Sequence, residues 1–154
     1  MPLQWLLDRF QACPRDDAVI WRDAVTTYGE LLGQIDAAHE FLSAQQVAAG
    51  ESVMLDADFS PRAVALLIAS VQQRLLVVPV ASHVVADRRD LARIGECSRR
   101  FHISDSGSYE AEHYPHRLGH QLLTTLRDAA SPGLVLFSSG STGHPKAAVH
   151  NFDS

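Results

Sequence analysis

The sequence is poor in cysteine, in long apolar runs and in the basic residues that a leader peptide needs. Cys13 and Cys97 are its only cysteines among 154 residues, which excludes the framework of a small disulfide-stabilised secreted domain. The longest apolar stretch, Leu75–Ser82, is too short to cross a bilayer. No basic segment precedes the apolar residues after Met1, so a secretory signal is not expected. These absences predict a cytoplasmic protein with no membrane span.

Positive charge is also scarce. Lysine and arginine total 13 against 18 acidic residues, and the net charge is −5. Broad binding to nucleic acid or to anionic lipid needs clustered positive charge, so neither is expected. The two basic pairs, Arg88-Arg89 and Arg99-Arg100, are interpreted as solvated helix faces. A single local site could still bind a nucleotide.

What is present is an alternation of two hydrophobic periodicities. Residues 18–21 and 24–26 form a predicted hairpin around Arg22-Asp23. Thr27 and Glu30 have the spacing of a helix capping box, and Ser60-Pro61 is typical of a second helix start. Further strands are expected at 52–56, 75–80, 101–104, 134–137 and 147–150, and helices at 3–10, 27–45, 64–72 and 86–98. This order predicts an α/β fold with a largely parallel sheet and flanking helices.

The stretch 105–120 lacks either periodicity. His113, His116 and His120 invite a metal-site interpretation, but no cysteine or paired carboxylate completes a ligand set. Pro115 and Gly119 would interrupt a helix that could align the imidazoles. A surface loop is therefore expected, with no metal site.

The most informative segment is residues 138–146, between two apolar β-type runs. Gly140 and Gly143 allow consecutive N–H groups to turn inward around an anion. Lys146 adds a mobile positive charge, and the hydroxyl groups are those of Ser138, Ser139, Ser141 and Thr142. Nine residues also exceed the usual two to five of a hairpin connection. We therefore predict a phosphate-binding loop, against the alternative of a flexible Gly/Ser linker.

Two common phosphate motifs do not fit this segment. The nucleoside-triphosphatase loop requires a second glycine where Pro145 stands. The dinucleotide fingerprint requires one residue between its first two glycines, but Ser141 and Thr142 separate Gly140 from Gly143.

Residues 138–146, Ser-Ser-Gly-Ser-Thr-Gly-His-Pro-Lys, instead resemble the phosphate-loop signature of the adenylate-forming (AMP-binding) superfamily. That family includes acyl- and aryl-CoA synthetases, adenylation domains of nonribosomal peptide synthetases, and luciferases. Upstream, Thr27–Leu31, Ala49–Val53 and Leu66–Pro79 are similar to other family segments. Arg74-Leu75 and Ala147 depart from the family pattern, where a Gly-Ala pair and a glycine are commoner.

The resemblance implies an ATP- and Mg²⁺-dependent ligase that converts a carboxylic acid and ATP to an acyl-adenylate and pyrophosphate. Transfer to coenzyme A or to a carrier-protein thiol would follow. The resemblance assigns phosphate binding to Ser138, Ser139, Gly140, Ser141, Thr142, Gly143 and Lys146. It assigns no catalytic residue within residues 1–154.

The resemblance also implies that residues 1–154 are the N-terminal part of the family's large domain. The adenine-binding, ribose-binding and catalytic-lysine motifs have no counterpart here, so the isolated chain is expected to be inactive. The alternative is a non-catalytic module that associates with a protein partner, including a second copy of itself, or binds nucleotide weakly.

Overall fold

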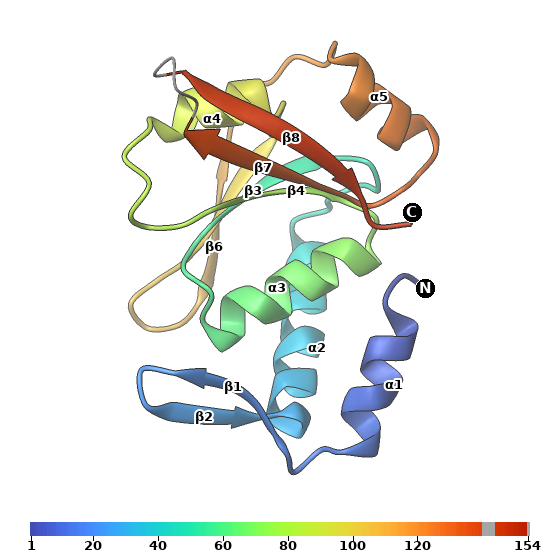
Figure 1. Ribbon diagram of the computed structural model, residues 1–154, viewed down its shortest axis with the longest axis vertical. Coiled ribbons are helices and arrows are strands. Elements are labelled where there is room, and N and C mark those ends of the chain that lie inside the picture. The colour runs from blue at the N-terminus through green and yellow to red at the C-terminus, as the bar shows by residue number, and fades with distance from the viewer. Residues whose placement is uncertain (140–143, 154) are drawn as a thin grey trace.

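The computed structural model describes residues 1–139 and 144–153 (Figure 1). The helices are α1 (Gln4–Ala12), α2 (Tyr28–Ala44), α3 (Pro61–Gln72), α4 (Arg88–Ile94) and α5 (Gln121–Asp128). The strands are β1 (Asp17–Trp21), β2 (Ala24–Thr27), β3 (Ser52–Asp56), β4 (Leu76–Val80), β5 (Arg99–Ile103), β6 (Tyr109–His113), β7 (Gly133–Ser139) and β8 (Pro145–Asn151). Within these described parts, no helix has the length and hydrophobicity that crossing a membrane requires.

Six strands form one sheet in the order β6-β5-β3-β4-β7-β8. The four inner strands are parallel, while β6 and β8 pair antiparallel with their neighbours at the two edges. Strands β1 and β2 form a separate antiparallel hairpin. The predicted α/β fold with a largely parallel sheet and flanking helices is therefore confirmed.

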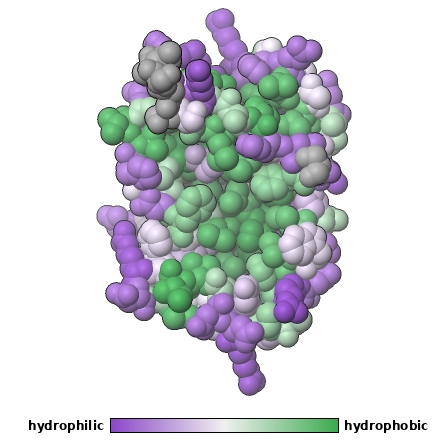
Figure 2. Space-filling view, in the orientation of Figure 1, coloured by the Kyte–Doolittle hydropathy of each residue, from purple (hydrophilic) through white to green (hydrophobic). Residues whose placement is uncertain are grey.

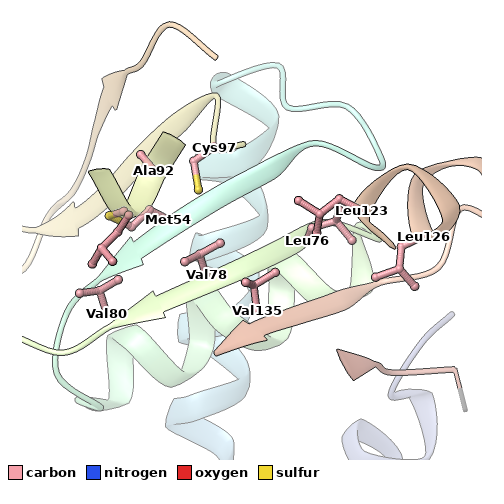
Figure 3. Close-up of a cluster of buried hydrophobic side chains, with 10 residues drawn as sticks. Met54, Leu76, Val78, Val80, Ala92, Cys97, Leu123, Leu126 and Val135 are labelled. Carbon is pink, nitrogen blue, oxygen red and sulfur yellow. The ribbon is translucent and has the colours of Figure 1, made fainter. Parts of the chain in front are cut away.

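Helices cover both faces of the sheet, as expected for buried parallel strands. On one face, α2 and α3 pack their apolar residues on Val53, Leu55, Val77 and Phe101. On the other face, α4 and α5 contribute Leu91, Ala92, Leu123 and Leu126 to a cluster with Met54, Val78 and Val135 (Figure 3). Strand β4 is almost continuously buried because it supplies side chains to both clusters.

Several local predictions from the sequence are confirmed. Thr27 and Glu30 form a reciprocal capping box at the start of α2, and the Ser60 hydroxyl accepts the amide of Ala63 at the start of α3. Arg22 and Asp23 both have positive φ, the geometry of a tight type I′ hairpin turn between β1 and β2.

Two regions differ from the sequence prediction. Helix α4 is shorter than residues 86–98, because Asp87 caps its N-terminus and the chain leaves the helix at Gly95. The predicted loop 105–120 contains strand β6, which pairs with β5 after a turn in which Gly107 has a positive φ. Helix α5 then begins after His120, and the sequence prediction missed it. The shortened α4 and strand β6 lie in polar segments, whereas α5 has Leu123 and Leu126 at helical spacing, a signal that the sequence prediction did not use.

Candidate functional site at the carboxyl edge of the sheet

The carboxyl ends of three neighbouring strands lie at one edge of the sheet. Strands β3, β4 and β7 are mutually parallel and end at Asp56, Val80 and Ser139. In open α/β sheets, ligands bind outside the carboxyl ends of the strands. We call this side the carboxyl edge, and the opposite side, where these strands begin, the amino edge.

The two described ends of the predicted phosphate-binding segment lie at the carboxyl edge, in β7 and β8. The ladder pairs Phe137 with Ala147, Ser138 with Lys146 and Ser139 with Pro145. The connection between the strands is therefore residues 140–144, rather than the nine residues expected. A connection of this length is ordinary for a hairpin, so its length does not indicate a phosphate-binding role. The predicted nine-residue connection is wrong because both ends of the motif continue the β7–β8 ladder.

The residues of the motif divide into two groups. Ser138 and Lys146 are exposed and lie directly opposite each other across the β7–β8 ladder. Ser139 continues the β7 backbone beside them. Gly140, Ser141, Thr142 and Gly143 lie outside the described residues.

The pairing of Ser138 with Lys146 has a chemical consequence. Side chains of directly opposite residues emerge on the same face of a sheet, with Cβ atoms about 4.5–5.5 Å apart. A hydroxyl donor and an ammonium group are therefore presented together to solvent at the carboxyl edge. This pair could hold one anionic group, such as a phosphate oxygen.

A second polar contact at this edge links the loops that follow β3 and β4. The Asp58 carboxylate accepts hydrogen bonds from the Ser82 hydroxyl at 2.6 Å and the Ser82 amide at 2.9 Å. These two bonds, hydroxyl first, hold the pKa of Asp58 below its ordinary value. Asp58 and Ser82 meet because each follows the end of one of two neighbouring parallel strands, β3 and β4.

Asp56, the last residue of β3, is held in ion pairs rather than solvated. Its side chain is only 8% exposed, and its Oδ2 accepts from Arg88 Nε at 3.1 Å and Arg100 Nε at 2.7 Å. Arg88 also donates to backbone carbonyls of the loop between β4 and α4. The interpretation of both basic pairs as solvated helix faces is wrong here, because one arginine of each pair binds Asp56, and Arg88 also positions this loop.

The described residues supply few alternatives for chemistry at this edge. Within residues 1–139 and 144–153, no group of three or more His, Cys, Asp and Glu side chains could hold a metal ion. Cys97 lies at the amino edge, and burial raises the pKa of its thiol to about 12, which makes it a poor nucleophile. Within the described residues, the exposed Ser138–Lys146 pair is therefore the candidate anion-binding group at this edge.

Comparison with solved structures finds the same fold in N-terminal domains of adenylate-forming enzymes. The N-terminal domain of FACL13 from Mycobacterium tuberculosis superposes with a TM-score of 0.72 at 19% identity, covering 98% of this chain and 44% of that one. The Klebsiella oxytoca NpsA N-terminal subdomain, in complex with 3-hydroxyanthranilyl-AMSN, gives 0.70 at 21% identity, covering 98% and 40%.

VinN is a third structure of this kind, with a TM-score of 0.71, 19% identity and coverage of 99% and 46%; it has also been solved with L-aspartate. The chain thus spans less than half the length of these neighbours. At these identities the likeness establishes the fold alone. No protein-family model matches the sequence, and no curated protein matches it.

Proposed function

We propose that residues 1–154 form the N-terminal part of the large domain of an ATP-dependent, AMP-forming acid–thiol ligase. The observation that carries this proposal is a coincidence of motif and place. A segment that resembles the adenylate-forming phosphate-loop signature has its two described ends at the carboxyl edge of a sheet that has the fold of adenylate-forming N-terminal domains. Neither the motif nor the fold alone would be as specific.

In the proposed reaction, a carboxylate oxygen of the acid attacks the α-phosphorus of ATP. The bond from that phosphorus to the oxygen bridging the α- and β-phosphates breaks, and pyrophosphate leaves with the electron pair. Residues 138–143 would hold the β- and γ-phosphates through backbone N–H groups and hydroxyls, and the Lys146 ammonium would neutralise their charge. Because charge builds on the leaving pyrophosphate, a fixed cation there favours bond breaking.

Magnesium usually accompanies ATP and would offset further phosphate charge. Residues 1–139 and 144–153 do not supply a cluster of ligands for it. The proposed role of this chain is therefore limited to its own donors, which bind and orient the leaving group. The adenine, the ribose, the acid and the accepting thiol, from coenzyme A or a carrier protein, would be bound by other parts of the enzyme.

Calorimetric titration of the 154-residue chain with pyrophosphate tests the binding part of this proposal. We expect weak binding that Lys146→Ala reduces by at least about tenfold, because one charge-assisted contact contributes about 1.5–3 kcal/mol. Lys146→Arg is the matched control and should retain most of the affinity. Equal heats from wild type and Lys146→Ala would contradict the assignment of Lys146.

Catalysis needs a separate experiment on the complete protein that contains this chain. Carboxylate-dependent exchange of labelled pyrophosphate into ATP, measured across a panel of acids, reports adenylate formation directly. The chain of 154 residues alone should show no exchange. Absence of exchange with every acid, from a complete protein that binds ATP, would contradict the ligase proposal.

A second candidate function is protein association, and it rests on exposed apolar surface at β7 and β8. Leu136 on β7 is 39% exposed, and its ladder partner Ala148 is also exposed. Figure 2 shows apolar side chains gathered across the middle of the face that Figure 1 presents. Such a surface favours burial against another protein surface. Light scattering tests self-association, and a monomer at all concentrations would contradict it.

A further inference from the structure

A polar groove runs between helix α4 and the edge strand β6, away from the carboxyl edge. One hollow of about 460 Å³ is bordered by Arg89 and Arg93 of α4 and by the end of β6 with Tyr114. A second, of about 290 Å³, is bordered by Arg93, His116 and Arg117. Both hollows share Arg93 and Pro115, so they form one continuous surface feature, which we call the α4–β6 groove.

The groove is positively charged, although the protein as a whole is acidic. Arg89, Arg93 and Arg117 are all exposed. Arg93 is 4.0 Å from Asp90, and within the described residues no carboxylate pairs with Arg89 or Arg117. The other acidic group that borders the groove, Glu112, already pairs with Arg100 at 3.2 Å. The groove therefore has an excess of cationic groups that an anionic ligand could neutralise.

The backbone of β6 adds a second feature to the same groove. β6 is the last strand of the sheet, and among the residues described no strand pairs with its outer side. Tyr114 N donates to Ser98 O, and Ser104 N donates to Ser108 O. These bonds set the alternation of the antiparallel ladder, so the N–H and C=O groups of Ala111 and His113 point away from β5. They are free to pair with an added strand.

The direction of the side chains relates these two features to each other. Tyr114 packs against the cluster that contains Leu91 and Ala92 of α4, so alternate residues of β6 face the helix. A strand added to β6 would likewise direct every second side chain toward α4. Those side chains would meet Arg89 and Arg93.

We propose that the α4–β6 groove binds an acidic peptide segment in extended conformation, which pairs with β6 as an added strand. Alternate glutamate or aspartate side chains of the segment lie against Arg89 and Arg93, and Arg117 extends the contact at one end. This interaction surface goes beyond the proposed ligase function and does not depend on it. Main-chain pairing supplies affinity, and the arginines select an acidic partner over a basic one.

Fluorescence anisotropy on the full 154-residue chain tests the proposal, with a labelled eight-residue peptide of alternating threonine and glutamate. We expect saturable binding that weakens as salt is added, and no comparable binding of the matched threonine–lysine peptide. The variant Arg89→Glu/Arg93→Glu should bind the acidic peptide at least about tenfold more weakly. Arg117→Glu is a separate single variant with a smaller expected loss.

Arg9→Glu/Arg15→Glu makes the same change in net charge at exposed positions outside the groove, and it should bind like wild type. Circular dichroism checks that each variant is folded. Equal binding by the two double variants would overturn the groove assignment.

A threonine–glutamate peptide methylated at alternate amide nitrogens keeps its charge but loses the N–H groups that pair with a strand. If it binds as well as the unmethylated peptide, the added-strand geometry is overturned. Hydrogen exchange should also slow at the amides of Ala111 and His113 in the complex; unchanged exchange there counts against the proposal.

Discussion

The two edges of the same sheet are built differently. At the amino edge, the side chain of Glu96 is 7% exposed; its Oε2 accepts from Arg127 Nη1 at 2.7 Å, and its Oε1 accepts the amides of Gly119 and His120. Arg127 also donates to the carbonyl of Gly50. This one ion pair connects the start of β3, the turn before β5 and both ends of α5. At the carboxyl edge, Ser138 and Lys146 are exposed.

This difference indicates a division of roles. A buried ion pair whose carboxylate accepts three hydrogen bonds holds strands and loops in one arrangement. An exposed hydroxyl and ammonium contribute little to folding and remain available to an anion. We therefore infer that the amino edge stabilises the fold and that the carboxyl edge is free for binding.

The largest expected effect is a difference in thiol reactivity between Cys97, at the amino edge, and Cys13, directly after α1. Cys97 lies beside Ser52 at the amino edge, and its raised pKa, about 12 against an ordinary 9.0, lowers the thiolate fraction by roughly a thousandfold. Cys13 is only partly buried and should react readily. Stopped-flow labelling of Cys13→Ser and Cys97→Ser separates the two rates. Similar rates would show that the amino edge opens easily.

Removing one partner of the buried ion pair should have the largest effect on stability. Arg127→Met leaves the Glu96 carboxylate buried without its cation, which costs about 3–5 kcal/mol of unfolding free energy. Arg93→Met is the matched control, because the Arg93–Asp90 pair is exposed and contributes about 0–1 kcal/mol. Urea unfolding measures both. A cost for Arg127→Met no larger than the control's would remove the distinction between the edges.

Acid should reveal the same ion pair. Burial acts to raise the pKa of Glu96, but the amide of His120 and the guanidinium of Arg127 outweigh it, and the net pKa lies below its ordinary 4.5. The folded state therefore binds this proton less readily than the unfolded state. The resulting stability is complete above about pH 4.5 and is lost as the pH falls through the lowered pKa.

The variant Glu96→Gln should accordingly flatten the loss of unfolding free energy as the pH falls below about 4.5. Asp58→Asn, at the carboxyl edge, removes a carboxylate whose pKa is also lowered, but one that solvent screens. Its effect should have the same sign and be smaller. A larger effect from Asp58→Asn would reverse the assignment of the two edges.

The smallest effects on stability should come from the binding groups themselves. Lys146→Ala and Ser138→Ala alter exposed side chains, and each should change the unfolding free energy by no more than about 0.5 kcal/mol. The same substitutions should weaken pyrophosphate binding. Thermal unfolding and calorimetry on the same samples separate the two properties. Loss of stability without loss of binding would assign these residues to the fold.

Much of the fold could be predicted because local interactions specify it. The capping box of Thr27 and Glu30 and the proline after Ser60 determine two helix starts within a few residues of sequence. The β-branched run of β4 indicates burial on both faces. By contrast, β6 is polar and obtains its pairing from β5, so no local pattern distinguishes it from a loop.

The candidate site likewise combines features that local sequence specifies with features that depend on contacts between strands. The order of hydroxyl residues, glycines, Pro145 and Lys146 is a property of the sequence, and it alone excludes the two commoner phosphate loops. That β7 and β8 pair up to Ser139 and Pro145, and that Ser82 contacts Asp58, are properties of the sheet. Spacing along the chain does not specify contacts between residues on different strands.

The sequence by itself determined the class of fold, most helix starts, the buried strands and the phosphate-loop motif, because each depends on neighbouring residues. Which charged groups are buried and which are exposed depends instead on contacts between residues that are distant in the sequence. Asp56 and Glu96 read as ordinary acidic residues, and burial together with arginines distant in sequence makes them structural. Lys146 keeps its charge exposed because the β7–β8 ladder brings it to the carboxyl edge, opposite Ser138.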